Sequence, residues 1–229
     1  MYMGTKLVEE VPFDEGLVHG REVTIRVKKL LAGHGLGPSS LSAVGVSVGP
    51  GSYTGIRVGV TAAKTLAFAL GLAVVPVSSL EAIACTVADQ GALEGPREVV
   101  VLIDGKQRHV YVARFRVEAA VVERLSGDQL VDLDGPADAV PTFAPEAVLV
   151  GDGVDAFLAR IDADVAAQWV LGEESWRWPR ASALGRRAVE KFLSGDTLKS
   201  REEVHGLVPV YLRPSEAERR LAKRRGERT

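Results

Sequence analysis

The chain has 229 residues, of which 46% are hydrophobic and 25% charged, as is usual for a soluble globular protein with a real core. Its formal net charge of −2 gives no electrostatic reason to expect strong autonomous binding to nucleic acid, and its single cysteine, Cys85, excludes an intramolecular disulfide. No secretory signal and no apolar stretch suited to a membrane helix is visible, so we expect a soluble protein of the reducing cytoplasm.

The predicted elements alternate between strands and helices. In chain order they are a strand at Lys6–Val11, a helix at Arg21–Ala32, a strand at Ala43–Val48, a helix to about Leu70, a strand at Ala73–Val77, and a helix capped by Ser78 or Ser79. After a polar passage at Asp89–Arg97, which we interpret as a domain boundary, come a hairpin of Glu98–Asp104 with Val110–Val117, a strand at Ala147–Val150, helices from about Asp155 and over Ala181–Leu193, and a closing segment at Val208–Pro214. This alternation predicts an α/β fold with a mostly parallel or mixed sheet.

The most informative segment is a glycine-rich loop between the second predicted strand and the helix after it. Its candidate anion-site residues are Gly49, Gly51, Ser52, Thr54 and Gly55. Free N–H groups at a helix start attract anions, and glycines permit close approach of a ligand, but a tight turn without a ligand explains the run equally well. The loop is neither a Walker A loop, because Ile56-Arg57 follow Gly55, nor a dinucleotide fingerprint, because its last gap is one residue too long.

The helix after this loop carries small residues at every fourth position, which makes one side of it nearly smooth. These residues are Gly55, Gly59, Ala63, Ala67 and Gly71. Another helix could pack there at a short interaxial distance. Two interpretations stay open: the smooth side covers the protein's own helix or sheet, or Gly55, Gly59, Ala63 and Ala67 form a face for a partner helix.

The segment 49–59 reads GPGSYTGIRVG and continues through Ala63-Lys64 to VSSLEA at 77–82. This run resembles the GPGSFTGLRIG…AKGLA…VSSLEAL run of the TsaB (YeaZ) family. Weaker similarities to the family follow at 103–111, at Gly151-Asp152-Gly153 and at 209–213. The resemblance therefore covers roughly residues 15 to 215.

The resemblance implies an actin-like/Hsp70-like ATPase (RNase H-like) fold with two lobes. Residues 1–97 would form an N-terminal lobe with the glycine loop and partner-binding helices, and residues 98–229 a second lobe plus a basic C-terminal tail. Family members normally begin with a strand carrying Asp-Thr-Ser and then a second strand, and neither is present here. We therefore expect a first lobe that lacks these two strands, the first of which would lie next to Ala43–Val48. Either the natural start lies upstream or the lobe is rearranged, and in both cases the missing first phosphate loop argues against nucleotide binding.

The resemblance also implies a function. In this family TsaB is a scaffold without chemistry of its own, which binds and activates TsaD for threonylcarbamoyl transfer to adenosine 37 of tRNAs that read ANN codons. TsaE, an ATPase, would join a ternary complex, and tRNA would be contacted indirectly. The sequence leaves open whether a homodimer through the same helices competes. No catalytic residue, cofactor or metal is expected, and the histidines at 19, 34, 109 and 205 lack the H-x-x-x-H spacing by which TsaD holds its metal.

Several features leave alternatives open. The polar hairpin tip (Asp104, Lys106, Arg108, Tyr111) is a partner contact or a solvated turn, and Asp152 is a ligand-facing carboxylate or a turn residue. Trp176 and Trp178, with the neighbouring Arg177, Pro179 and Arg180, stack on RNA or form a packed edge, and the basic tail Arg219–Arg228 contacts tRNA or is a solvated helix end. The alternative functions are an actin-like-fold ATPase or kinase that uses the glycine loop, and a peptidase, for which no Ser/His/Asp arrangement is identifiable.

Overall fold

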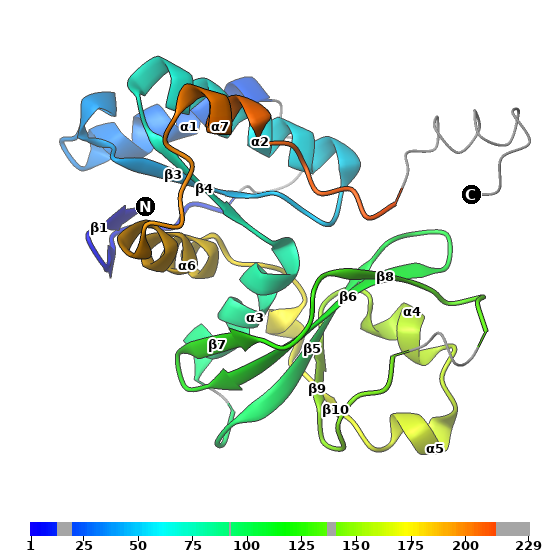
Figure 1. The fold of residues 1–229 in the computed structure, drawn as a ribbon. Helices are drawn as coiled ribbons and strands as arrows, with labels where there is room; N and C mark the ends of the chain where they lie inside the picture. The colour runs from blue at the N-terminus through cyan, green and yellow to red at the C-terminus, as the bar shows by residue number, and fades with distance from the viewer. Residues whose placement is uncertain (13–19, 92, 137–140, 214–229) are drawn as a thin grey trace, which may run out of the picture.

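The computed structural model describes residues 1–12, 20–91, 93–136 and 141–213, which form two α/β lobes (Figure 1). The elements of the first part of the chain are β1 (Tyr2–Met3), β2 (Lys6–Leu7), α1 (Gly20–Gly33), a 3-10 turn (Pro38–Ser40), β3 (Ala43–Ser47), α2 (Tyr53–Leu70), β4 (Ala73–Val77) and α3 (Ser79–Gln90). Strands β3 and β4 pair in parallel, and β1 and β2 form a separate antiparallel pair. Local signals set the helix ends, since Ser78 caps α3 and Gly71, in a left-handed conformation, ends α2.

The second lobe is built around a six-stranded mixed sheet. Its elements are β5 (Arg97–Asp104), β6 (His109–Glu118), β7 (Val121–Arg124), β8 (Gln129–Asp132), β9 (Val148–Val150), α4 (Val154–Leu158), α5 (Ala163–Ala166), β10 (Val170–Leu171) and a 3-10 turn (Glu174–Trp176). The strand order is β10-β9-β5-β6-β7, with β8 also paired to β6. Strands β10, β9 and β5 run parallel, whereas β6 is antiparallel to β5, β7 and β8.

After the second lobe the chain returns to the first. Helix α6 (Ala181–Ser194) packs on β3 and β4, and α7 (Arg201–Gly206) packs on α2. The amine of Lys64 on α2 donates hydrogen bonds to the carbonyls of His205 (2.7 Å) and Leu207 (2.9 Å). The predicted boundary at 97 coincides with the start of β5, but the assignment of all of 98–229 to the second lobe is corrected by these contacts. An amphipathic helix packs its apolar face on an uncovered face of a sheet, even when the helix and the sheet are far apart in the sequence.

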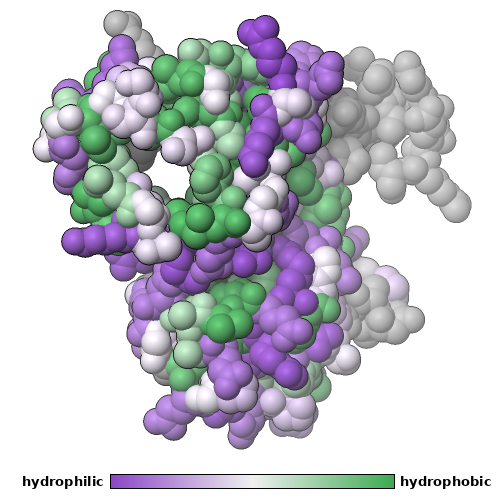
Figure 2. Space-filling model, turned by 60° about the vertical axis from the view of Figure 1, so that its left-hand side comes forward, coloured by the Kyte–Doolittle hydropathy of each residue, from purple (hydrophilic) through white to green (hydrophobic). Residues whose placement is uncertain are grey.

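The sheet of the first lobe is small. In the part of the chain that the structure describes, β3 pairs only with β4 and has no strand on its other edge. The predicted strand Lys6–Val11 is shorter, Lys6–Leu7, and the N–H of Val8 adds one more bond of the same antiparallel pair, to the carbonyl of Met1. In Figure 2 a hollow is visible in the surface of the first lobe on the side that faces the viewer.

Helix α3 joins the lobes. All its residues from Ser79 to Ala88 are buried, and it packs both on α6 and on strands β5, β6 and β7. Two large side chains of this helix, Leu80 and Ile83, lie in one core cluster with Phe115 and Trp176. Because one helix serves both cores, the lobes share a continuous apolar contact instead of meeting only through a linker.

Cys85 lies in the middle of α3 and is fully buried. This burial raises the pKa of its thiol to about 12, so the reactive thiolate is scarce at neutral pH. We expect the native protein to resist a thiol reagent such as DTNB at pH 8 and to react with it once urea unfolds the chain. Rapid reaction of the native protein, measured by the released thiolate absorbance, would contradict this packing of α3.

Candidate functional site

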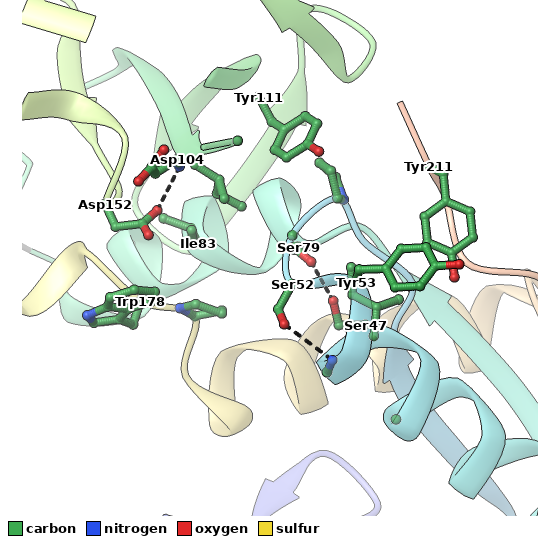
Figure 3. Close-up of a pocket in the computed structure, with 18 of the residues that line it drawn as sticks. Ser47, Ser52, Tyr53, Ser79, Ile83, Asp104, Tyr111, Asp152, Trp178 and Tyr211 are labelled. Carbon is green, nitrogen blue, oxygen red and sulfur yellow. Dashed lines mark hydrogen bonds between the residues drawn. The ribbon is translucent and has the colours of Figure 1, made fainter. Parts of the chain in front are cut away.

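A cleft of about 980 Å³ lies between the two lobes (Figure 3). The glycine loop and the start of α2 form one wall. The tip of the β5–β6 hairpin and the turn after β9 form the other, and residues of β3 and α3, residues 178–179, Tyr211 and Arg213 also line the cleft. A concave site with an apolar floor and a few polar groups is the usual form of a binding pocket.

The backbone of the glycine loop adopts conformations that favour glycine. Gly49 and Gly51 have φ values of +109° and +152°, and a Cβ atom on Gly49 would lie 2.9 Å from the carbonyl oxygen of Val210. Of the predicted anion-site residues, Gly51, Ser52 and Gly55 line the cleft. Gly49 and Thr54 do not line it, although both belong to the same loop. The glycine at 49 is thus required by the close approach of the C-terminal segment.

The serine hydroxyls of this wall take part in structural hydrogen bonds. Ser52 caps α2 by accepting the N–H of Gly55 at 3.3 Å. The hydroxyls of Ser47 and Ser79 lie 2.7 Å apart, and the N–H of Ser79 donates to the carbonyl of Gly49 at 2.8 Å. These bonds tie the glycine loop to the start of α3.

On the opposite wall two carboxylates face the cleft. The N–H of Asp104 donates to Asp152 at 3.0 Å, and Asp104 pairs with the amine of Lys106 at 2.5 Å. Burial would raise the pKa of Asp104, but the hydrogen bonds from Lys106 outweigh it and hold that pKa below its usual value. Burial raises the pKa of Asp152, and the hydrogen bond from the N–H of Asp104 and the charge of Lys106 offset this only in part. Asp152 is therefore both a turn residue and a cleft-lining carboxylate.

Aromatic side chains stand at the rim of the cleft. The rings of Tyr53 and Tyr211 stack with 5.0 Å between their centroids, and Arg57 lies over Tyr53 and donates to its hydroxyl at 2.9 Å. Trp178, which is 63% exposed, lines the cleft from another side. Trp176 by contrast is buried and donates its indole N–H to Gln90 at 2.8 Å, so it forms the packed edge. The sequence contains no signal that separates the environments of these two tryptophans.

The tip of the β5–β6 hairpin holds the remaining candidates. Tyr111 is buried, and Arg108 pairs with Asp134 at 2.8 Å. Lys106, Gln107 and Arg108 all have positive φ, between 51° and 63°, which side chains other than glycine seldom adopt. The predicted turn is present, and its backbone is under strain. Residues 214–229, with the basic tail, and His19 lie outside the described residues.

The small residues of α2 divide between the interior and the surface. Ala63 and Ala67 are buried in one core cluster with Val46 of β3, Gly59 is half-buried, and Gly55 is exposed. The smooth side thus covers the protein's own sheet, and Ala63 and Ala67 are not available to a partner helix. The surface of α2 that is open to solvent carries Tyr53, Arg57, Thr61, Thr65 and Phe68.

None of the described helices is long and apolar enough to cross a membrane. Within the same ranges, no three His, Cys, Asp or Glu side chains are grouped so as to hold a metal ion.

Comparisons with known proteins agree with one another. The family model of TsaD, described as tRNA N6-adenosine threonylcarbamoyltransferase, matches residues 11–220. The tRNA threonylcarbamoyladenosine biosynthesis protein TsaB of Bacillus subtilis is 32% identical over 192 residues, which cover 84% of this chain and 78% of the relative. The protein of the same description from Escherichia coli is 27% identical over 206 residues, 89% of this chain and 84% of the relative. The solved structure of YeaZ from Pseudomonas aeruginosa superposes with a TM-score of 0.69 at 23% identity and covers 86% of this chain and 87% of its own, which confirms the predicted fold class.

Proposed function

Since the chain belongs to the TsaB (YeaZ) family of tRNA threonylcarbamoyladenosine biosynthesis, we propose that it is a non-catalytic subunit that binds and activates a TsaD-type threonylcarbamoyltransferase. In this proposal TsaE joins a ternary complex, tRNA is contacted only indirectly, and a homodimer competes for the same surface. The reaction supported is threonylcarbamoyl transfer to adenosine 37 of tRNAs that read ANN codons.

The observation that carries this proposal is the solvent-facing side of α2. Its exposed residues recur at positions 53, 57, 61 and 65, which places them on one side of the helix. Large apolar side chains lie along it, with Tyr53 46% and Phe68 38% exposed. On the adjacent helix α1, Ile25 is 43% exposed. Two adjacent helices with exposed aromatic and aliphatic side chains suit a helix-to-helix interface with a partner.

A second observation supports the proposal that the subunit is non-catalytic. The serine hydroxyls at the glycine loop serve as a helix cap and as a hydrogen-bonded pair, and Asp104 is neutralised by Lys106. Groups committed to such bonds are poorly placed to act as nucleophiles or bases. We therefore propose a structural role for the cleft, in which its contacts fix the relative position of the two lobes.

Co-purification with the TsaD-type protein of the same genome, followed by size-exclusion chromatography, tests the proposal. We expect a stable one-to-one complex, and little ATP turnover by this chain alone. Absence of a complex between two folded proteins would refute the scaffold. Partner-independent ATP hydrolysis would instead favour the actin-like-fold ATPase.

A further inference from the structure

The C-terminal segment 207–213, which we call the strap, connects the two lobes along the cleft. Upstream it is attached to the first lobe. The carbonyl of Leu207 accepts from Lys64 at 2.9 Å, the N–H of Val210 donates to the carbonyl of Val48 at 2.8 Å, and the Tyr211 ring stacks on Tyr53. Figure 3 shows the two tyrosine rings side by side at the first-lobe wall.

Downstream the strap is attached to the second lobe by Leu212, which packs against the core cluster of that lobe, and by the side chain of Arg213. The guanidinium of Arg213 donates to the carbonyls of Gly105 and Lys106, each at 3.0 Å, and to the side-chain oxygen of Gln107 at 2.6 Å. Hydrogen bonds from a charged, planar guanidinium are stronger and more directional than those of neutral donors. Arg213 thus makes the charged attachment between the strap and the hairpin tip.

The turn that Arg213 contacts is held in an unfavourable backbone conformation. Its three consecutive left-handed residues, 106–108, persist only if neighbouring groups compensate their strain. The carbonyls of 106, 107 and 108 also accept from the N–H of His109, the ring of His109 and the N–H of Leu133. The carbonyl oxygens of Gly105 and Lys106 accept hydrogen bonds from Arg213, so the conformation of the turn suits the binding of this side chain.

We propose that Arg213 sets the separation of the two lobes: by fastening the strap to the β5–β6 turn it holds the cleft at its present width, and its release opens the cleft. Tyr211 and Arg213 both line the cleft, so a change at this attachment alters the lining directly. The strap also connects the cleft to the first residue of α2 through the Tyr211–Tyr53 stack. Arg213 makes this attachment whichever partner α2 binds.

Two measurements on Arg213→Ala test it. The first is the distance between spin labels on Thr61→Cys in α2 and Glu123→Cys in β7, both exposed positions on different lobes. The second is hydrogen exchange at the amides of His109, bonded to Lys106, and Val210, bonded to Val48. We expect a longer and broader distance distribution and roughly tenfold or faster exchange at both amides.

The matched control is Arg108→Ala, which removes an exposed arginine from the same turn together with its ion pair to Asp134 but leaves the strap bonds in place. It should leave the label distance and Val210 exchange unchanged. If Arg213→Ala accelerates only His109, or changes neither quantity, the proposal is wrong and Arg213 merely supports the turn. Should that variant fail to fold, Arg213→Lys and Gln107→Ala, which each weaken only part of the attachment, are expected to shift both readouts in the same direction by less.

Discussion

Replacing Thr65 by glutamate is expected to weaken the proposed complex with a TsaD-type subunit by roughly 100-fold or more. Thr65 is exposed in the middle of the open side of α2, one turn from Thr61 and three residues before Phe68. A carboxylate buried there without a partner costs about 3–5 kcal/mol on association. Titration of the purified partner by isothermal calorimetry measures the change, and a melting curve checks that the variant is folded.

The matched control for this variant is Val121→Glu. Val121 is an apolar residue on β7 of the second lobe and is 67% exposed, so the same negative charge is added away from α2. Binding should remain at the wild-type level. If Thr65→Glu binds normally and Val121→Glu does not, the partner surface is on the second lobe and the assignment to α2 is wrong.

The largest loss of stability is expected from Gly151→Ala. Gly151 has φ of +104°, and a Cβ atom there would lie 2.0 Å from the carbonyl oxygen of Leu102 in β5. A backbone atom of a central strand cannot move aside as a flexible side chain could. The positive φ and the overpacking together should cost about 3–5 kcal/mol, which corresponds to a fall in melting temperature on the order of 10 °C.

Gly127→Ala is the control for this change, since a Cβ atom at Gly127 meets nothing within 4 Å and its φ is not in the left-handed region. Urea unfolding should give nearly equal free energies for this variant and the wild type. A Gly151→Ala protein of wild-type stability would show that the turn after β9, which carries Asp152, does not approach β5 as closely as described.

Much of the first lobe could be predicted because its signals are local. The helix 21–32 is observed as α1 (Gly20–Gly33), and the predicted strands at 43–48 and 73–77 match β3 and β4 within a residue. Glycine at 71 and serine at 78 act on their own neighbours, so the adjacent sequence is enough to place them. Strands such as β10, which has only two residues, give no periodicity to detect.

The site was predictable only in part. A stripe of small residues indicates close packing but does not identify the element on which it packs. The burial of Ala63 and Ala67 against the sheet therefore became evident only from the structure. The left-handed backbone at 106–108 leaves no sequence signal, because ordinary side chains adopt it only where tertiary contacts compensate the strain. Here one compensating group is Arg213, whose bond to Gly105 spans 108 positions of the chain. Return of α6 to the first sheet is non-local in the same way.

That return has a consequence for the order in which the protein acquires its structure during synthesis. Residues 97–176, which hold the strands of the mixed sheet, leave the ribosome before α6 does, whereas β3 and β4 are made before that sheet and are covered by α6 only after it. Domains generally fold as units while the chain emerges. The lobe that begins the sequence is therefore the one that finishes folding second, and until α6 docks, its apolar strand face is open to unwanted contacts with other nascent chains.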